Sequence, residues 1–142
     1  MKRILILEGE PVIVALLRIL LRDYSVVETT TAAQALQTFT EHNRQFDLLL
    51  AEVNLPISSG VEVALSLRSQ LPTLKVILSS SYPLGMWREQ DVADLQRLGD
   101  HSVTLIEKPF LPKALTDLVH ALIGPAKESE PVKQRAVAAS QG

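Results

Sequence analysis

Five short apolar runs alternate with five longer amphipathic segments, and this alternation restricts the fold more than any other feature of the sequence. The apolar runs occupy residues 3–7, 25–28, 46–52, 75–79 and 102–107. The segments between and after them span residues 11–22, 31–42, 59–71, 86–98 and 111–123 and have the apolar spacing of helices. Strands that alternate with helices form right-handed βαβ units. The sequence therefore predicts an α/β protein with a doubly wound parallel sheet of five strands, covered by helices on both faces.

Composition and charge limit the kinds of protein that this chain can be. Its 142 residues suit one domain with one core. From Gly124 the sequence has prolines, mixed charges and small residues without an apolar period, so we expect a domain over residues 1–123 and a flexible tail or linker remnant over 124–142. A net charge of −2 argues against nucleic acid and membrane surfaces as partners, and the lack of cysteine excludes thiol chemistry. The first apolar run is too short for a signal peptide, which favours a cytoplasmic protein.

Polar residues follow four of the five apolar runs directly. In a doubly wound sheet, ligands bind at the carboxyl ends of the strands, so these residues should form one site. They are Glu8, Gly9 and Glu10 after the first run, Glu52 and Asn54 after the third, Ser79 and Ser80 after the fourth, and Lys108 with Pro109 after the fifth. Simpler structural roles remain open, because acids favour helix N-termini and a serine hydroxyl often bonds its local backbone.

Four of these segments resemble the receiver domain of response regulators in two-component signalling, a CheY-like superfamily. The matching segments are LILEGEP, DLLLAEVNLPISSG, VILSS and EKPF, and the likeness runs from about Lys2 to Ile123. The resemblance implies a flavodoxin-like receiver fold with strand order 2-1-3-4-5, five helices and a cis peptide bond before Pro109; this strand order is the one the general doubly wound rule gives for receivers. It also implies that Glu52 occupies the position at which the family accepts phosphate from a histidine kinase.

The chain departs from the family pattern at several of these positions. The resemblance implies a magnesium site at Gly9, Glu52 and the backbone carbonyl of Asn54, but glycine offers no side-chain ligand. Glu52 carries one methylene more than the usual aspartate, so we expect it to pair with Lys108 and the Ser79 hydroxyl. Leu105 stands where the family has its switch aromatic. We therefore predict an atypical, pseudo-receiver pocket without a cofactor; a metal, if bound, would use Glu8, Glu52 and Asn54.

Three functions are consistent with the sequence. The first is a receiver module that acts through phosphate-independent protein contacts and catalyses no reaction. The second is a conventional phosphorelay receiver that accepts phosphate at Glu52. The third is a small doubly wound nucleotide- or ligand-binding domain, but G-x-G-x-x-G, G-x-x-x-x-G-K-[ST] and G-x-S-x-G motifs are all missing.

Apolar residues outside the predicted core indicate where protein partners bind. Val12 and Ile19 widen the apolar arc of the first helix, and Trp87 is of a type enriched at interfaces. The alternative is that these side chains pack against their own helices. The expected partners are a histidine kinase, a phosphotransfer protein or an output protein, with a homodimer as a further option.

Overall fold

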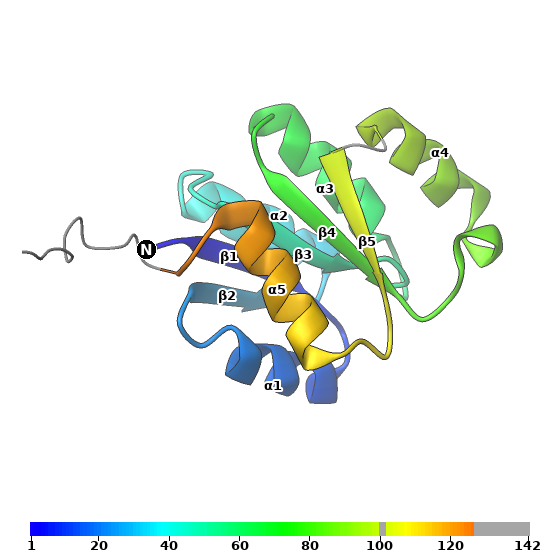
Figure 1. The fold of residues 1–142 in the computed structure, drawn as a ribbon. Coiled ribbons are helices and arrows are strands. Elements are labelled where there is room, and N and C mark those ends of the chain that lie inside the picture. The colour runs from blue at the N-terminus through cyan, green and yellow to red at the C-terminus, as the bar shows by residue number, and fades with distance from the viewer. Residues whose placement is uncertain (100–101, 127–142) are drawn as a thin grey trace, which may run out of the picture.

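The computed structural model describes residues 1–99 and 102–126, and in this part of the chain five strands form one parallel sheet (Figure 1). The predicted fold and the strand order β2-β1-β3-β4-β5 are confirmed. The strands are β1 (Arg3–Leu7), β2 (Ser25–Thr29), β3 (Leu48–Glu52), β4 (Lys75–Ser80) and β5 (Val103–Glu107). The helices are α1 (Pro11–Leu20), α2 (Ala32–Glu41), α3 (Gly60–Gln70), α4 (Glu89–Leu98) and α5 (Pro112–Ile123), with a short 3-10 helix, η1 (Leu84–Met86), before α4.

The helices cover both faces of the sheet. In Figure 1, α1 and α5 lie on one face, whereas α2, α3 and α4 lie on the other. Strand side chains alternate between the two faces, and helices cover both of them. The central strands are therefore apolar on both sides. Thus Ile4, Ile6 and Leu50 pack with α1 and α5, while Leu5, Leu49 and Ala51 pack with the opposite helices. None of the described helices is long and apolar enough to cross a membrane.

The start of α4 differs from the sequence prediction. A helix was expected from Met86, but Trp87 and Arg88 have extended backbones and α4 begins only at Glu89. Trp87 turns into the core, where it is 8% exposed, and its Nε1 donates a hydrogen bond to the Tyr82 carbonyl at 3.1 Å. Burying this large apolar side chain stabilises the extended segment more than another helical turn would.

The first residues of the expected tail are attached to the domain. The Tyr24 hydroxyl donates to the Gly124 carbonyl at 2.7 Å, and the Lys2 amide donates to the Ala126 carbonyl at 3.1 Å. Residues 124–126 therefore lie against the end of the sheet at which strand β1 begins. The rest of the predicted tail, residues 127–142, lies outside the described residues.

Gly60, the first residue of α3, allows this helix to approach the end of β3. A β-carbon at residue 60 would lie 2.9 Å from the Glu52 carbonyl carbon and 3.0 Å from the Ala51 β-carbon. The Ser59 hydroxyl accepts a hydrogen bond from the Val61 amide at 3.0 Å and caps the helix at the same point. This close approach fixes the backbone of Glu52.

Replacing Gly60 with alanine should lower the free energy of unfolding by about 1–3 kcal/mol, because backbone atoms of β3 must move to admit the methyl group. Gly85→Ala is the matched control, since a β-carbon there meets no atom within 4 Å. Urea unfolding of both variants measures the difference. Equal free energies of unfolding for the two variants would show that α3 can move away from β3 without loss of stability.

Candidate functional site at the carboxyl ends of the strands

Each of four neighbouring strands is followed, at its carboxyl end, by a polar side chain on the same face of the sheet. The last apolar side chains that they direct toward α1 and α5 are Ile6, Leu50, Ile77 and Ile106. Two residues further along, on the same face, stand Glu8, Glu52, Ser79 and Lys108. Glu52 and Ser79 are direct partners in the β3–β4 register. The alternation of strand side chains thus brings these four residues together, as the sequence predicts.

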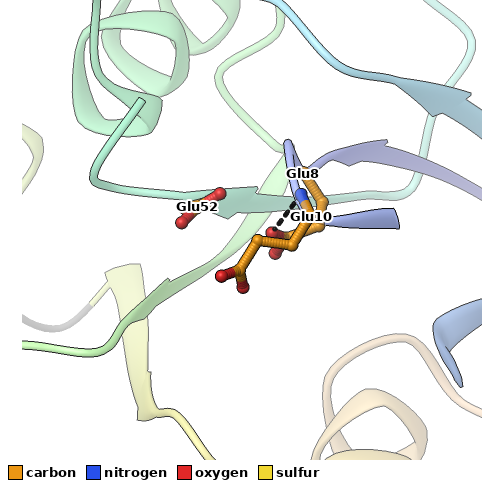
Figure 2. A group of neighbouring side chains, drawn as sticks. All are labelled: Glu8, Glu10 and Glu52. Carbon is orange, nitrogen blue, oxygen red and sulfur yellow. Dashed lines mark hydrogen bonds between the residues drawn. The ribbon is translucent and has the colours of Figure 1, made fainter. Parts of the chain in front are cut away.

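Lys108 lies among three carboxylates. Its Nζ is 3.0 Å from the Glu8 carboxylate, 3.1 Å from that of Glu10 and 3.2 Å from that of Glu52. The ammonium is buried, with 5% of the side chain exposed, and Glu8 is similarly buried, whereas the Glu10 side chain is 60% exposed. Figure 2 shows the three glutamates gathered where β1 and β3 end. The predicted pair between Glu52 and Lys108 is present, as part of a larger cluster.

Backbone amides of the loop after β1 support this cluster. The Gly9 amide donates to Glu52 Oε1 at 3.3 Å. The Glu10 amide donates to Glu8 Oε2 at 3.1 Å, as Figure 2 shows. Glu10 is the residue before α1, but its side chain makes no capping hydrogen bond and extends to Lys108 instead. The Glu10 carboxylate therefore pairs with Lys108, although the residue also stands at the start of α1.

Burial and neighbouring charges change the acidity of two groups in the cluster. Burial, together with the nearby Glu52 carboxylate, raises the pKa of Glu8 from 4.5 to about 7, although Lys108 opposes this shift. Burial disfavours the charged ammonium of Lys108, but hydrogen bonds and attraction from the glutamates outweigh burial and raise its pKa. Near neutral pH, Glu8 is thus partly protonated while Lys108 stays charged.

The raised pKa of Glu8 should make folding stability depend on pH. Between pH 4.5 and about 7 the folded protein retains a proton that the unfolded chain releases, so stability falls as the pH rises through this range. The Glu8→Gln variant lacks this titration. We expect the wild type to lose about 2–3 kcal/mol relative to Glu8→Gln across the range, measured by urea unfolding at a series of pH values. Parallel pH profiles for the two proteins would contradict the shift.

Ser80 and Asn54 form a second set of contacts beside the cluster. The Ser80 hydroxyl donates to Asn54 Oδ1 at 2.8 Å and accepts from the Tyr82 amide at 3.0 Å. Ser79 is buried, but within the described residues no hydrogen bond joins its hydroxyl to Glu52. The part of the prediction that paired Ser79 with Glu52 is therefore not supported by this geometry.

The remaining predicted positions are found around the site. Leu105 is 44% exposed on β5, and the peptide bond between Lys108 and Pro109 is cis, as the resemblance implies. Val12 and Ile19 are exposed on α1, at 79% and 59%. The prediction that Trp87 lies on a partner surface is wrong, because its side chain is buried against the core.

An open cavity of about 310 Å³ lies over the cluster, and Gly9, Glu10, Glu52 and Asn54 contribute to its wall. The three glutamates could hold a metal by chemistry alone, since one oxygen of each lies within 4.8 Å of the others. As the side chains lie, however, the Lys108 ammonium already contacts all three carboxylates, and Gly9 adds no ligand. The arrangement of the three carboxylates therefore fits the Lys108 ammonium rather than a divalent metal ion.

The sequence placed Glu10 in the site but did not reveal that its carboxylate pairs with Lys108. Its position before Pro11 suggested a residue that favours the start of α1. The only available signal was its spacing of two residues from Glu8. That spacing cannot show that the backbone turns at Gly9 and returns the carboxylate to Lys108.

Comparison with known proteins gives consistent matches. A family model described as the response regulator receiver domain matches residues 4–120. The transcriptional regulatory protein KdpE of Mycobacterium tuberculosis is 31% identical over 112 residues, which cover 78% of this chain and 46% of KdpE. The chain thus spans about half the length of this curated relative.

Solved structures show the same fold. A CheY-like receiver domain from Methanospirillum hungatei is 25% identical, with a TM-score of 0.71, over 85% of this chain and 92% of that one. The receiver domain of the hybrid histidine kinase CckA is 27% identical, with a TM-score of 0.67, over 86% of this chain and 99% of that one.

Proposed function

Because the chain belongs to the response-regulator receiver domain family, we propose that it is a receiver module that signals through protein contacts and needs neither phosphate nor magnesium. Its partners would be a histidine kinase, a phosphotransfer protein or an output protein in the cytoplasm. A receiver changes partners by a shift between two states of its pocket. In this proposal the pocket is held in one state by its own side chains.

The position of Lys108 carries the proposal. Its ammonium lies within 3.2 Å of three carboxylates, and one of these belongs to Glu52, at the phosphate-accepting position. The Gly9 amide also bonds this carboxylate. Glu52 thereby makes contacts that a negatively charged phosphoryl oxygen would otherwise make. Phosphate and a divalent ion would both have to displace an ion-paired network that is already formed.

One observation favours the alternative, a phosphorelay receiver that uses Glu52 as the acceptor. The Glu52 carboxylate borders the open cavity of about 310 Å³, so a phosphodonor could reach it. A glutamate can form an acyl phosphate, but its extra methylene places the oxygen away from the in-line position. The ion pair with Lys108 also lowers the nucleophilicity of the carboxylate.

Treatment with a phosphodonor tests the two functions against each other. The protein is mixed with Mg²⁺ and acetyl phosphate, or with Mg²⁺ and beryllofluoride, and the backbone amide resonances of residues 8, 52, 79 and 108 are followed by NMR. We expect no saturable shifts and no added phosphoryl mass. Magnesium-dependent shifts at these four residues would reject phosphate-independent action and support phosphorylation of Glu52.

A further inference from the structure

A cavity of about 390 Å³ lies at the end of the sheet where β4 and β5 begin, opposite the glutamate cluster. Its wall comes from the end of α3, the loop between α3 and β4, and the starts of the two strands, while Leu122 of α5 adds an apolar side chain. Cavities that bind small molecules commonly measure about 300–1,000 Å³ and combine apolar surface with a few polar groups. We call this one the basic cavity, because its charged lining residues are cations.

Arg68, one of these cations, lies across the starts of β4 and β5. Its guanidinium donates to the Leu74 carbonyl at 2.9 Å, to the Ser102 hydroxyl at 2.9 Å and to the Ser102 carbonyl at 2.8 Å. All three acceptors are neutral, and burial lowers the pKa of Arg68. Arg18 and Arg88, by contrast, pair with carboxylates at 2.7 Å and 3.1 Å. Within the described residues the Arg68 charge thus has no carboxylate partner, and its guanidinium has further N–H groups for a ligand.

Lys75 and Thr104 add two more donors to the wall of the basic cavity. Ile77 pairs with Thr104 in the β4–β5 register and stands two residues after Lys75, so the three side chains lie on the face of the sheet that α5 covers. Over residues 1–99 and 102–126, Lys75 forms no ion pair and the half-buried Thr104 hydroxyl has no hydrogen bond. Such a hydroxyl is available to a ligand.

The chemistry of this wall favours an anion with two charges and several oxygen atoms. Arg68 and Lys75 supply two positive charges, and none of the described lining residues is an acid. Guanidinium and ammonium groups are the side-chain cations with which proteins bind phosphate. Pro72 and Leu122 provide apolar surface in the same cavity, on which a short carbon chain can be buried.

We propose that the basic cavity binds a small phosphate monoester. The phosphate group accepts hydrogen bonds from Arg68 and Thr104 and pairs with the Lys75 ammonium, while the carbon chain of the ligand packs against Leu122. This site goes beyond the proposed function and does not depend on it, because it lies at the other end of β4 from the glutamate cluster. Binding in the basic cavity requires neither magnesium nor phosphorylation of Glu52.

Titration with n-butyl phosphate, at a pH where it carries two charges, tests the site directly. We expect saturable amide shifts at residues 74–76 and 102–104 and no shifts at residues 8–10 and 52. Butyrate has one charge fewer and inorganic phosphate lacks the carbon chain, so each should bind at least about threefold more weakly. High salt should weaken binding as well, because the attraction is electrostatic. Shifts that do not saturate would show an adventitious ion only, and equal binding of butyrate would overturn the choice of phosphate.

Variants of the protein locate the ligand. Lys75→Gln and Thr104→Val should each weaken binding about fivefold, because each removes one donor from the wall. Lys113→Gln is the matched control, since Lys113 is an exposed lysine that does not line the cavity. Arg68 also joins two loops, so its replacement can unfold the chain, and the Lys75 and Thr104 variants decide the test without it. Equal affinities of Lys75→Gln and Lys113→Gln would overturn the proposal.

A further variant tests whether the chain neutralises the cavity with a carboxylate of its own. Asp100 lies outside the described residues and stands two positions before Ser102 in the sequence. Similar affinities of the wild type and Asp100→Asn for n-butyl phosphate would support the proposal. Binding by Asp100→Asn alone would overturn it, because the carboxylate of Asp100 would then take the place of the ligand. Neither outcome depends on whether acetyl phosphate modifies Glu52, so the two proposals fail separately.

Discussion

Replacing Lys108 with methionine should lower the free energy of unfolding by about 3–5 kcal/mol at neutral pH. Methionine has a similar length and fills the same space. The loss arises because Glu8 and Glu52, which are 3% and 12% exposed, are left together without a cation. A buried carboxylate without a partner costs far more than a missing surface ion pair.

Urea unfolding at neutral pH measures this loss, and Lys113→Met is the matched control. Lys113 pairs with Asp117 at 2.6 Å, but both side chains are well exposed, at 85% and 64%. The control should stay within about 0.5 kcal/mol of the wild type. The deficit of Lys108→Met should shrink as the pH is lowered toward about 7, because Lys108 lowers the pKa of Glu8 and its loss lets this carboxyl take up a proton at a higher pH than in the wild type.

A second substitution identifies the source of the loss. If repulsion and burial of the carboxylates destabilise Lys108→Met, then adding Glu52→Gln should recover part of the lost stability, and the double-mutant cycle should give a coupling energy of at least about 1 kcal/mol. Additive effects would mean that the Lys108–Glu52 pair does not stabilise the fold. In that case the ion-paired cluster could not hold the pocket in one state.

The fold was accessible from the sequence because the strands and helices have different periods. Both faces of the central strands are apolar, and Pro11 and Thr31 mark the starts of helices where the structure has them. The error at Trp87 has a tertiary cause. Its residue type favours an interface and its neighbours favour a helix, but the core cluster that Trp87 joins is formed by separate elements of the fold and cannot be inferred from the local sequence.

The sequence predicts which residues of the site are neighbours, but it does not predict which hydrogen bonds and ion pairs they form. Strand ends identify Glu8, Glu52 and Lys108 as neighbours, since parallel strands deliver their carboxyl ends to one edge. The return of Glu10 to Lys108 and the bond from the Gly9 amide to Glu52 depend on the path of a short loop. Side-chain spacing alone does not determine such a path.

Replacing Gly9 and Glu52 together with aspartate should create a magnesium site. The aspartate introduced at position 9 supplies the missing carboxylate, and the shorter side chain introduced at position 52 withdraws its oxygens from Lys108 and leaves room for a cation. Position 9 accepts a side chain, because the nearest atom to its β-carbon is Glu52 Oε1 at 3.8 Å, and this atom belongs to the second replaced residue. Magnesium prefers one or two carboxylates together with water, which is the set that the double variant offers.

Magnesium titrations followed by Trp87 fluorescence and by amide shifts at residues 8, 9 and 52 test this expectation. The double variant should show saturable binding and should then accept phosphate from acetyl phosphate at the aspartate introduced at position 52. Each single variant is informative: Gly9→Asp alone adds a carboxylate but retains the Glu52–Lys108 pair, and Glu52→Asp alone breaks this pair without adding a ligand. Both should bind magnesium at least about tenfold more weakly than the double variant, since each lacks one of the two changes. A flat titration of a folded double variant would mean that Lys108 keeps the cation position even when the side chain at position 52 is shortened, and that the pocket differs from a working receiver by more than these two residues.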